Sequence, residues 1–289
     1  MSILFSIAVH EDEMSIIDLI DNINYYCKDC YIVLHLSKQS KLNLNIEHTN
    51  LFINKNQFIT GYADGTLSFV HYSNYQYANK NKLKYEYFIP FGSNQLFIKE
   101  GVEKYILGYD KSYIPNVSND NYQLSIYRKD SVMIELLGLN ISKSAPEGTF
   151  YKKQLIEDFV KNKKVERYFL DSEWLYKKNV GLKIRKVFCF TSKLFYKLDI
   201  IKYLPSFIAR YSYASEELLF PSIISSGLTK DRFCYIPWHK KDLSVTIDEI
   251  NECLSNGKYL SVKRIERSYD DPVRKYIREV LSDNYKIKQ

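Results

Sequence analysis

Hydrophobic and polar residues alternate along the first third of the chain with two different spacings. Largely apolar runs at residues 3–9 and 31–36 have the composition of buried strands, and apolar positions at helical spacing over residues 14–23 lie between them. Further short strands are predicted at 52–53, 58–59 and 87–91, and a helix at 68–78. Because strands that alternate with helices favour a mostly parallel sheet, the chain is predicted to open with a β-strand, helix, β-strand unit of an α/β protein.

The pattern is less regular over the rest of the chain. Residues 109–121 are typical of a long polar loop, and residues 123–139 favour a pair of strands. Beyond them, helices are predicted at 152–161, 193–204, 215–225 and 247–254, strands at 187–190 and 233–236, and a last ordered segment at 258–263. No repeat, Gly/Ser linker or break in composition divides the 289 residues, which predicts one domain over residues 1–289.

Polar residues follow three of the predicted strands. His10 ends the first, Ser37 follows the second, and residues 92–95 follow the strand at 87–91. Because ligands of open parallel sheets bind beyond the carboxyl ends of the strands, we expect these residues around one crevice. His35 lies inside a predicted strand and is expected to be structural.

The composition is that of a basic protein rich in aromatic residues. The formal net charge is +7, with 26 Tyr and 16 Phe, and anionic partners are therefore favoured. No zinc-finger, basic-zipper or RNA-binding signature accompanies the basic residues, so nucleic acid is not expected as a partner. Five cysteines make no disulfide framework, and the apolar run at residues 1–10 lacks a basic leader, so we expect a cytoplasmic protein without signal peptide or membrane span.

Two adjacent carboxylates stand at the start of a predicted apolar helix. Glu216 and Glu217 follow Ser215, and this is also the ordinary composition of a helix N-terminus with Ser215 as its cap. A carboxylate held at that position could equally accept a proton from a sugar hydroxyl. Lys263, in the last predicted segment, could neutralise a departing diphosphate, and the two residue types together meet the needs of glycosyl transfer.

Seven segments in a specific order carry a resemblance to a known family; they are residues 7–10, 33–38, 62–70, 85–94, 213–217, 233–239 and 259–263. Over nearly the whole chain they resemble the apolar-His strand, the Ile-His-Val-Asp-Lys strand, the Ser-Pro-Asp-Glu motif and the lysine-containing ending of the core-2/I-branching β-1,6-N-acetylglucosaminyltransferases. That family has bacterial relatives and includes the peptide xylosyltransferases. The resemblance implies a GT-A-like fold with a Rossmann-like, mostly parallel central sheet flanked by helices. Residues 1–108 would bind a nucleotide sugar, and residues 109–289 would bind the acceptor and carry the catalytic residues.

The resemblance also implies a role for each candidate residue. Glu217 is the expected catalytic base, and Glu216 is a helper that hydrogen-bonds the acceptor or the backbone and whose charge raises the pKa of Glu217. Lys263 takes the position of the diphosphate-binding lysine. The other implied positions are Val9, His10 and Ser37 for the nucleoside, Trp238 and Asn94 for the acceptor, and one of His239, Lys240 and Lys241 as a second cation at the diphosphate.

The implied reaction transfers a sugar, with inversion, from a nucleotide-diphosphate donor, UDP-linked in the resembled family, to a glycan or lipid-linked glycan. Synthesis of bacterial surface polysaccharide is the expected context. The chain has no Asp-x-Asp element, the lookalikes at 11–13 and 171–173 are interpreted as acidic turns, and no metal or other cofactor is expected. Ser37 stands where the family has an Asp that meets the nucleoside, and residues 92–94 also differ, so the donor sugar stays open between N-acetylglucosamine and another hexose or pentose.

Two further segments and two rival classes stay open. Residues 145–152 are interpreted as a turn that leads into a helix, and the tail at 263–267 with Arg274, Lys275 and Arg278 as a solvated basic face. That face could dock on an anionic lipid-linked acceptor, which would give peripheral contact with the inner face of the plasma membrane. The rival classes are a non-catalytic protein of the same fold that binds sugar nucleotides or glycans, and a nucleic-acid-binding protein.

Overall fold

The computed structural model describes residues 1–289 except 11, 39, 41, 43, 45, 47, 62, 115–120, 224–226, 239–242 and 287–289, and it describes only the backbone of residues 179, 180 and 223. Within the described residues, seven strands form one sheet in the order β3-β2-β1-β4-β7-β6-β8, and three form a smaller sheet in the order β5-β10-β9. The larger sheet contains β1 Ile3–Val9, β2 Cys30–Leu36, β3 Leu51–Ile53, β4 Tyr87–Gly92, β6 Lys111–Ser112, β7 Tyr151–Lys152 and β8 Thr229–Lys230. The smaller sheet contains β5 Gln95–Phe97, β9 Cys234–Tyr235 and β10 Ser261–Lys263.

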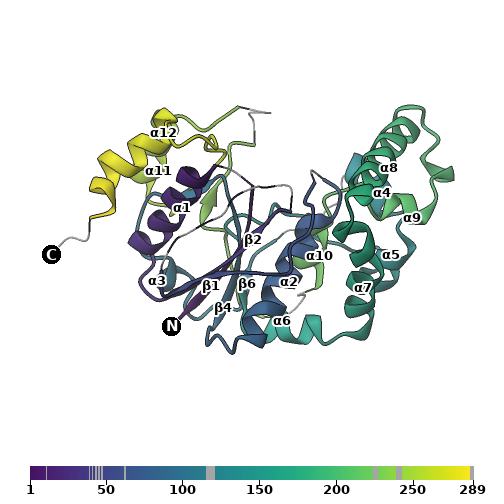
Figure 1. The fold of residues 1–289 in the computed structure, drawn as a ribbon, viewed down its shortest axis with the longest axis horizontal. Helices are drawn as coiled ribbons and strands as arrows, with labels where there is room; N and C mark the ends of the chain where they lie inside the picture. The colour runs from purple at the N-terminus through teal and green to yellow at the C-terminus, as the bar shows by residue number, and fades with distance from the viewer. Residues whose placement is uncertain are drawn as a thin grey trace.

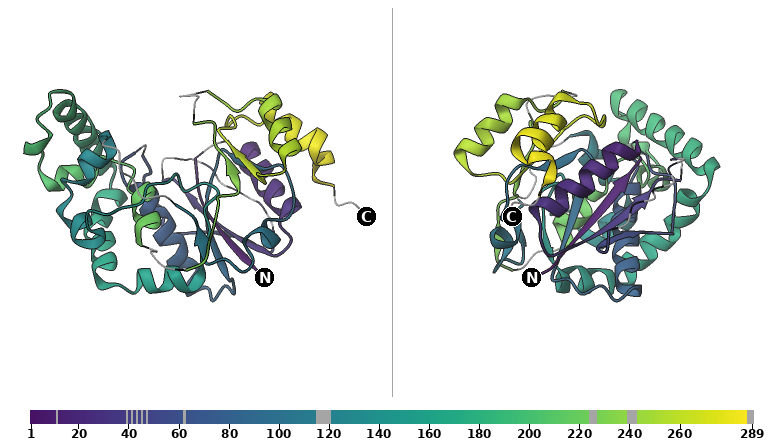
Figure 2. Two further views of the ribbon diagram at one scale, coloured as in Figure 1. Left: turned by 180° about the vertical axis from the view of Figure 1, so that it is seen from behind. Right: turned by 60° about the vertical axis from the view of Figure 1, so that its left-hand side comes forward.

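Helices flank the central sheet and extend beyond it at one end (Figure 1). They are α1 Glu13–Tyr26, α2 Thr66–Lys80, α3 Val102–Ile106, α4 Tyr122–Tyr127, α5 Ser131–Leu137, α6 Lys153–Val160, α7 Lys163–Lys177, α8 Asn179–Lys197, α9 Ser206–Ala209, α10 Glu216–Ile223, α11 Ile247–Asn256 and α12 Pro272–Lys275. Short turns η1 Ile201–Tyr203, η2 Tyr276–Leu281 and η3 Asp283–Tyr285 complete the helical segments. Seen from both sides, α1, α11 and α12 gather at one end, and α4, α5, α7, α8 and α9 at the other (Figure 2). Among the described helices, none combines the length and the hydrophobicity that a membrane span needs.

The alternation of side chains along β1 divides the core into two clusters, one on each face of the sheet. Phe5 and Ile7 pack in the same cluster as Ile20 of α1, whereas Leu4 packs in the cluster that contains Phe69 of α2. Successive side chains of a strand point to opposite faces, so a strand that is covered on both sides needs apolar residues at every position. The continuous apolar run that predicted β1 therefore reflects helices on both faces.

The strand pairing confirms a mostly parallel α/β sheet. β1 runs parallel to both β2 and β4, with Val9 opposite Leu36 and Ala8 opposite Gly92. The strand β7 is the exception, because it pairs antiparallel with both β4 and β6. The carboxyl ends of β1, β2 and β4 consequently meet at one edge, as the order of elements predicted.

The predicted strand pair at residues 123–139 is wrong, because this segment forms the helices α4 and α5. Asn121 caps α4 by accepting a hydrogen bond from the backbone amide of Leu124 at 3.2 Å, and Asp130 caps α5 by accepting one from Met133 at 3.3 Å. α5 ends at Gly138, whose φ of 75° suits a residue without a side chain. These two cap residues are the sequence signal for the helices, and the apolar residues that follow each of them have the composition of short strands.

Three other local predictions are wrong or incomplete. The expected strand at 187–190 lies inside the long helix α8, and the expected loop at 109–121 contains the short strand β6. Residues 58–59 form no strand. The side chain of Phe58 packs in the core, and its backbone amide donates a hydrogen bond to Nε2 of His35 at 3.2 Å. His35 is fully buried, and burial lowers its pKa to about 3, which agrees with the structural role expected for it.

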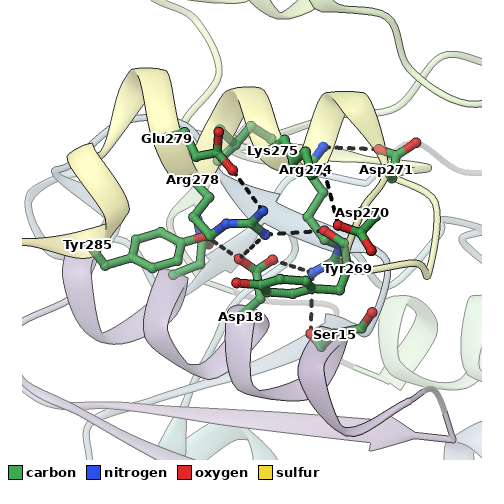
Figure 3. A network of polar contacts seen from close by, with 12 residues as sticks. Ser15, Asp18, Tyr269, Asp270, Asp271, Arg274, Lys275, Arg278, Glu279 and Tyr285 are labelled. Carbon is green, nitrogen blue, oxygen red and sulfur yellow. Dashed lines mark hydrogen bonds and ion pairs between the residues drawn. The ribbon is translucent and has the colours of Figure 1, made fainter.

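Two of the basic residues expected on a solvated C-terminal face, Arg274 and Arg278, are buried. Asp18 of α1 accepts hydrogen bonds from Arg274 at 2.6 Å, from Arg278 at 3.2 Å and from the hydroxyl of Tyr285 at 3.1 Å (Figure 3). Asp18 and Arg274 are completely buried, and the side chain of Arg278 is 7% exposed. Of the three residues expected in solvent, only Lys275 is well exposed. Arg274 and Arg278 fasten the C-terminal helix to α1 and are not available to an anionic partner.

Candidate functional site

A cavity of about 680 Å³ opens at the carboxyl ends of the parallel strands. Its lining includes seven of the residues predicted from the sequence: His10, Ser37, Asn94, Glu216, Glu217, Trp238 and Lys263. The expected crevice beyond the strands is thus present, and the closing third of the chain contributes the opposite wall. Val9 is not part of the lining, because its side chain is buried in the core at 1% exposure. His239, Lys240 and Lys241 lie outside the described residues.

The start of α10 is held in place by close contact with the start of α2. The hydroxyl of Ser215 lies 2.7 Å from that of Ser68, and the carbonyl of Ser215 accepts the backbone amide of Leu219 at 2.7 Å. A Cβ atom added to Gly65 would lie 3.2 Å from Oγ of Ser215, and the φ of Gly65 is 77°. Glycine therefore lets the two helix starts approach closely, and this approach directs the first turn of α10 towards the cavity.

Glu216 is the more perturbed of the two adjacent carboxyl groups. It is 5% exposed, and its Oε2 has no hydrogen-bond partner among the described residues. Burial raises the pKa of Glu216 to about 8, with the neighbouring charge of Glu217 as a further cause. At neutral pH Glu216 is therefore mainly protonated and neutral. A protonated Glu216 places no negative charge beside Glu217, and the hydrogen-bonding helper role expected for it stays a prediction.

Glu217 is the ionisable partner that keeps access to solvent. Its side chain is 26% exposed, and its Oε2 lies 3.6 Å from Nζ of Lys143. Burial raises the pKa of Glu217, and the cation of Lys143 opposes that rise. The backbone of the same loop pairs with α10, since the amide of Ser144 donates to the carbonyl of Glu217 at 2.9 Å. Lys143 is thus fixed beside the carboxylate, and sequence analysis did not identify it.

Lys263 does not stand alone in the cavity, because it forms an ion pair with Glu147. Glu147 is 7% exposed, and burial alone would raise its pKa; the charge and the hydrogen bond of Lys263, together with a backbone hydrogen bond, hold the pKa below its usual value. Gly148 positions this carboxylate, with a φ of 74° and no room for a Cβ atom, which would lie 2.4 Å from Cβ of Cys234. The segment was predicted to be a plain turn. A single acid between Pro146 and Gly148 has no local pattern that distinguishes it from a solvated turn.

A third residue that sequence analysis missed is His71, on the buried face of α2. It lines the cavity, and its Nδ1 lies 2.8 Å from the hydroxyl of Ser6. Burial lowers the pKa of His71 to about 4, although the charge of Glu147 opposes this effect. The imidazole is therefore neutral at physiological pH and gives the cavity floor a polar group without charge.

Basic residues continue along the cavity wall after Lys263. Arg264 and Arg267 both contribute to the lining. Arg264 has a φ of 71°, a left-handed conformation that costs energy in a residue with a side chain, and its guanidinium donates to the carbonyl of Pro237 at 2.9 Å. The resemblance implies a second cation at one of residues 239–241, and Arg264 carries a positive charge in the described lining of the cavity.

Trp238 stands at the mouth of the cavity. Its side chain is 61% exposed, which is unusual for an indole and leaves a flat apolar face accessible to a ligand. The guanidinium of Arg232 lies 5.7 Å from the centre of the Trp238 ring, a cation–π contact that helps to hold the indole.

Metal ligands do not gather in the described part of the chain, where no three His, Cys, Asp or Glu residues are placed to share an ion. The two acidic residues of α7 that resemble a metal-binding motif form ion pairs within the helix: Asp171 pairs with Arg167 at 3.6 Å, and Glu173 pairs with Lys177 at 2.5 Å.

No protein-family model matches this chain, and a comparison with curated proteins also gave no match.

Proposed function

We propose that this chain is an inverting glycosyltransferase that moves a sugar from a nucleotide-diphosphate donor to a hydroxyl group of a glycan or lipid-linked glycan. The observation that carries the proposal is that the carboxylate of Glu217 and the ammonium group of Lys263 line one cavity at the carboxyl ends of parallel strands. A base and a cation that share such a cavity are the two groups that a direct displacement at an anomeric carbon requires.

In this mechanism Glu217 accepts the proton of the acceptor hydroxyl while that oxygen attacks the anomeric carbon. The bond from that carbon to the donor phosphate breaks, and its electron pair leaves with the nucleoside diphosphate. Lys263 neutralises the charge that develops on the leaving group, which stabilises the transition state more than the ground state. Attack from the face opposite the leaving group inverts the anomeric configuration. The raised pKa of Glu217 makes it a stronger proton acceptor than an exposed carboxylate.

The neighbouring acids have distinct roles in the proposal. Glu216, with a pKa of about 8, stays protonated and can donate a hydrogen bond to the acceptor without competing for its proton. Glu147 holds Lys263 while the donor is absent, and the incoming diphosphate takes over or shares that cation. Arg264 adds a second positive charge beside Lys263. Trp238 offers its exposed face to a sugar ring of the acceptor.

The two halves of the chain contribute different groups to the cavity. Residues 1–108 supply His10, Ser37 and Asn94, and residues 109–289 supply the base, the cations and Trp238. A sheet in which the parallel strands β3, β2, β1 and β4 are followed by the antiparallel β7 is compatible with a GT-A-like arrangement, which we include in the proposal. The donor would be UDP-linked, the transfer would need no metal because side-chain cations meet the diphosphate, and the reaction would serve bacterial surface polysaccharide synthesis in the cytoplasm.

A panel of nucleotide sugars tests this proposal. Binding and slow hydrolysis of each donor are measured by calorimetry and product analysis, with and without a chelator, for the wild-type protein and for Lys263→Gln. We expect one donor class to bind, its hydrolysis to be insensitive to the chelator and its released sugar to have the inverted anomeric form. Lys263→Gln should weaken binding of the nucleoside diphosphate. Binding without hydrolysis or transfer of any donor would contradict the enzymatic assignment, and a retained anomeric form would contradict the mechanism.

A further inference from the structure

The outer face of α8 and the segment after it expose an unusual number of large apolar side chains. They are Val187, Phe190, Leu194, Leu198, Tyr203 and Phe207, with exposed fractions between 42% and 69%. The first four follow at spacings of three and four residues, so they form one stripe along the helix. We call these six residues the α8 face. It lies in the outermost group of helices, at the end of the molecule opposite α11 and α12 (Figures 1 and 2).

The residues around the α8 face include several lysines and a single acidic residue. The exposed lysines of this segment are Lys183, Lys186, Lys193, Lys197 and Lys202. Asp199 is the only acidic residue between residues 178 and 207. None of the five lysines forms an ion pair with a carboxylate among the described residues. Apolar side chains in a stripe with uncompensated cations at its border are the composition of a helix that lies at the surface of an anionic bilayer.

The opposite face of α8 packs against the rest of the protein, and this packing fixes the orientation of the helix. Arg185 is completely buried, and its Nε lies 3.1 Å from Asp64. Its guanidinium also donates to the carbonyl of Ile59 at 2.9 Å. The ring of Phe188 stacks on that of Tyr211 with centres 6.2 Å apart. These contacts fix the inner side of α8 against the segment that contains Ile59. Within the α8 face, the ring of Phe207 packs edge-on against that of Phe188 with centres 5.8 Å apart, and all six side chains remain largely exposed.

We propose that the α8 face docks this protein on an anionic lipid bilayer. Charge favours a bilayer over a second copy of the chain, because a two-fold contact through this face would bring the two sets of lysines together with one acid on each side to offset them. Docking does not depend on the proposed glycosyl transfer, and it assigns membrane contact to a surface other than the C-terminal residues Arg274 and Arg278, which are buried.

Vesicle sedimentation tests the proposal. The full-length protein is mixed at low salt with vesicles of phosphatidylcholine alone or of phosphatidylcholine with phosphatidylglycerol. We expect sedimentation with the anionic vesicles and little with the neutral ones. Lys186→Gln with Lys193→Gln and Lys197→Gln should lower the partition coefficient about a hundredfold, given the attraction of each lysine to an anionic surface. Phe190→Ser with Leu198→Ser should lower it at least about tenfold, because two inserted side chains are lost.

Matched controls come from exposed residues elsewhere. Leu107→Ser with Val280→Ser removes two apolar side chains that are 61% and 66% exposed. Lys80→Gln with Lys82→Gln and Lys84→Gln removes three exposed lysines. Both controls should bind anionic vesicles like the wild-type protein, and thermal unfolding should show that every variant is folded.

Three results would overturn the proposal. The first is a wild-type protein that fails to sediment with anionic vesicles at low salt. The second is an equal loss of binding in the α8-face variants and in their controls. The third is a concentration-dependent dimer that Phe190→Ser with Leu198→Ser abolishes, without vesicle binding by the wild-type protein, which would identify a second copy as the occupant of this face.

Discussion

Replacing Glu216 by glutamine tests whether the cavity holds this carboxyl group in its neutral form. Glu216 is 5% exposed, its Oε2 has no partner among the described residues, and its pKa is raised from 4.5 to about 8. Glutamine is similar in size and carries no charge at any pH. The substitution therefore removes the titration of this site and leaves the volume of the site nearly unchanged.

The magnitude follows from the difference between the folded and unfolded pKa of Glu216. Between pH 4.5 and 8 the unfolded chain releases this proton while the folded protein retains it, so raising the pH favours unfolding. The cost of burying this carboxyl group to the free energy of unfolding is absent below the unfolded pKa and complete above the folded pKa. A difference of one pKa unit corresponds to about 1.4 kcal/mol, so the full cost is about 5 kcal/mol. Between pH 5.5 and 8.5 the expected change is about 3 kcal/mol.

Urea unfolding at pH 5.5, 7 and 8.5 measures this change. The free energy of unfolding of the wild-type protein should fall relative to that of Glu216→Gln by about 3 kcal/mol over this range. Glu252→Gln, at an exposed position on α11, is the matched control and should follow the wild-type protein. Parallel pH dependences of the wild-type protein and Glu216→Gln would refute the assignment of a neutral, buried carboxyl group.

Other substitutions test the ion pairs and the backbone around the site. Glu147→Gln removes the carboxylate that neutralises Lys263, so calorimetry should show about tenfold tighter binding of a nucleoside diphosphate, whereas weaker binding would mean that Glu147 orients the lysine. Asp18→Asn leaves the buried guanidinium of Arg274 without its counter-ion and removes one of the two acidic partners of Arg278, so it should cost about 3–5 kcal/mol in urea unfolding, and a cost well under 1 kcal/mol would show that the network is not stabilising. Gly148→Ala places a Cβ atom against Cys234 at a positive φ and should lower the free energy of unfolding by at least about 2 kcal/mol. A Gly148→Ala protein that unfolds at the same urea concentration as the wild-type protein would contradict this.

The elements that position the site could be predicted because they are specified by local patterns. β1, β2 and β4 are buried on both faces and are therefore apolar at nearly every position, and α1 and α2 carry apolar residues at helical spacing. The strand predicted at 187–190 was wrong because its apolar residues are not all buried. Its apolar residues include the exposed Val187 and Phe190 of α8, and a short apolar run does not distinguish a strand from part of a helix.

The candidate site was predictable only in part, because some of its contacts join distant segments. Glu217 and Lys263 stand beside recognisable helix and strand signals, and both line the cavity. The partner of Lys263 is Glu147, which belongs to a turn without any periodic pattern, and His71 lies on a helix face that looks like ordinary core. The burial that raises the pKa of Glu216 results from tertiary packing and has no signature in the local sequence.

The most direct test of glycosyl transfer is the turnover of Glu217→Gln with the donor and acceptor that the wild-type protein uses. If Glu217 is the base, transfer should fall by about 10²–10⁴-fold, while calorimetry should give a donor affinity within about threefold of the wild-type value. A Glu217→Gln protein that transfers sugar at the wild-type rate would contradict the assignment of this carboxylate as the catalytic base.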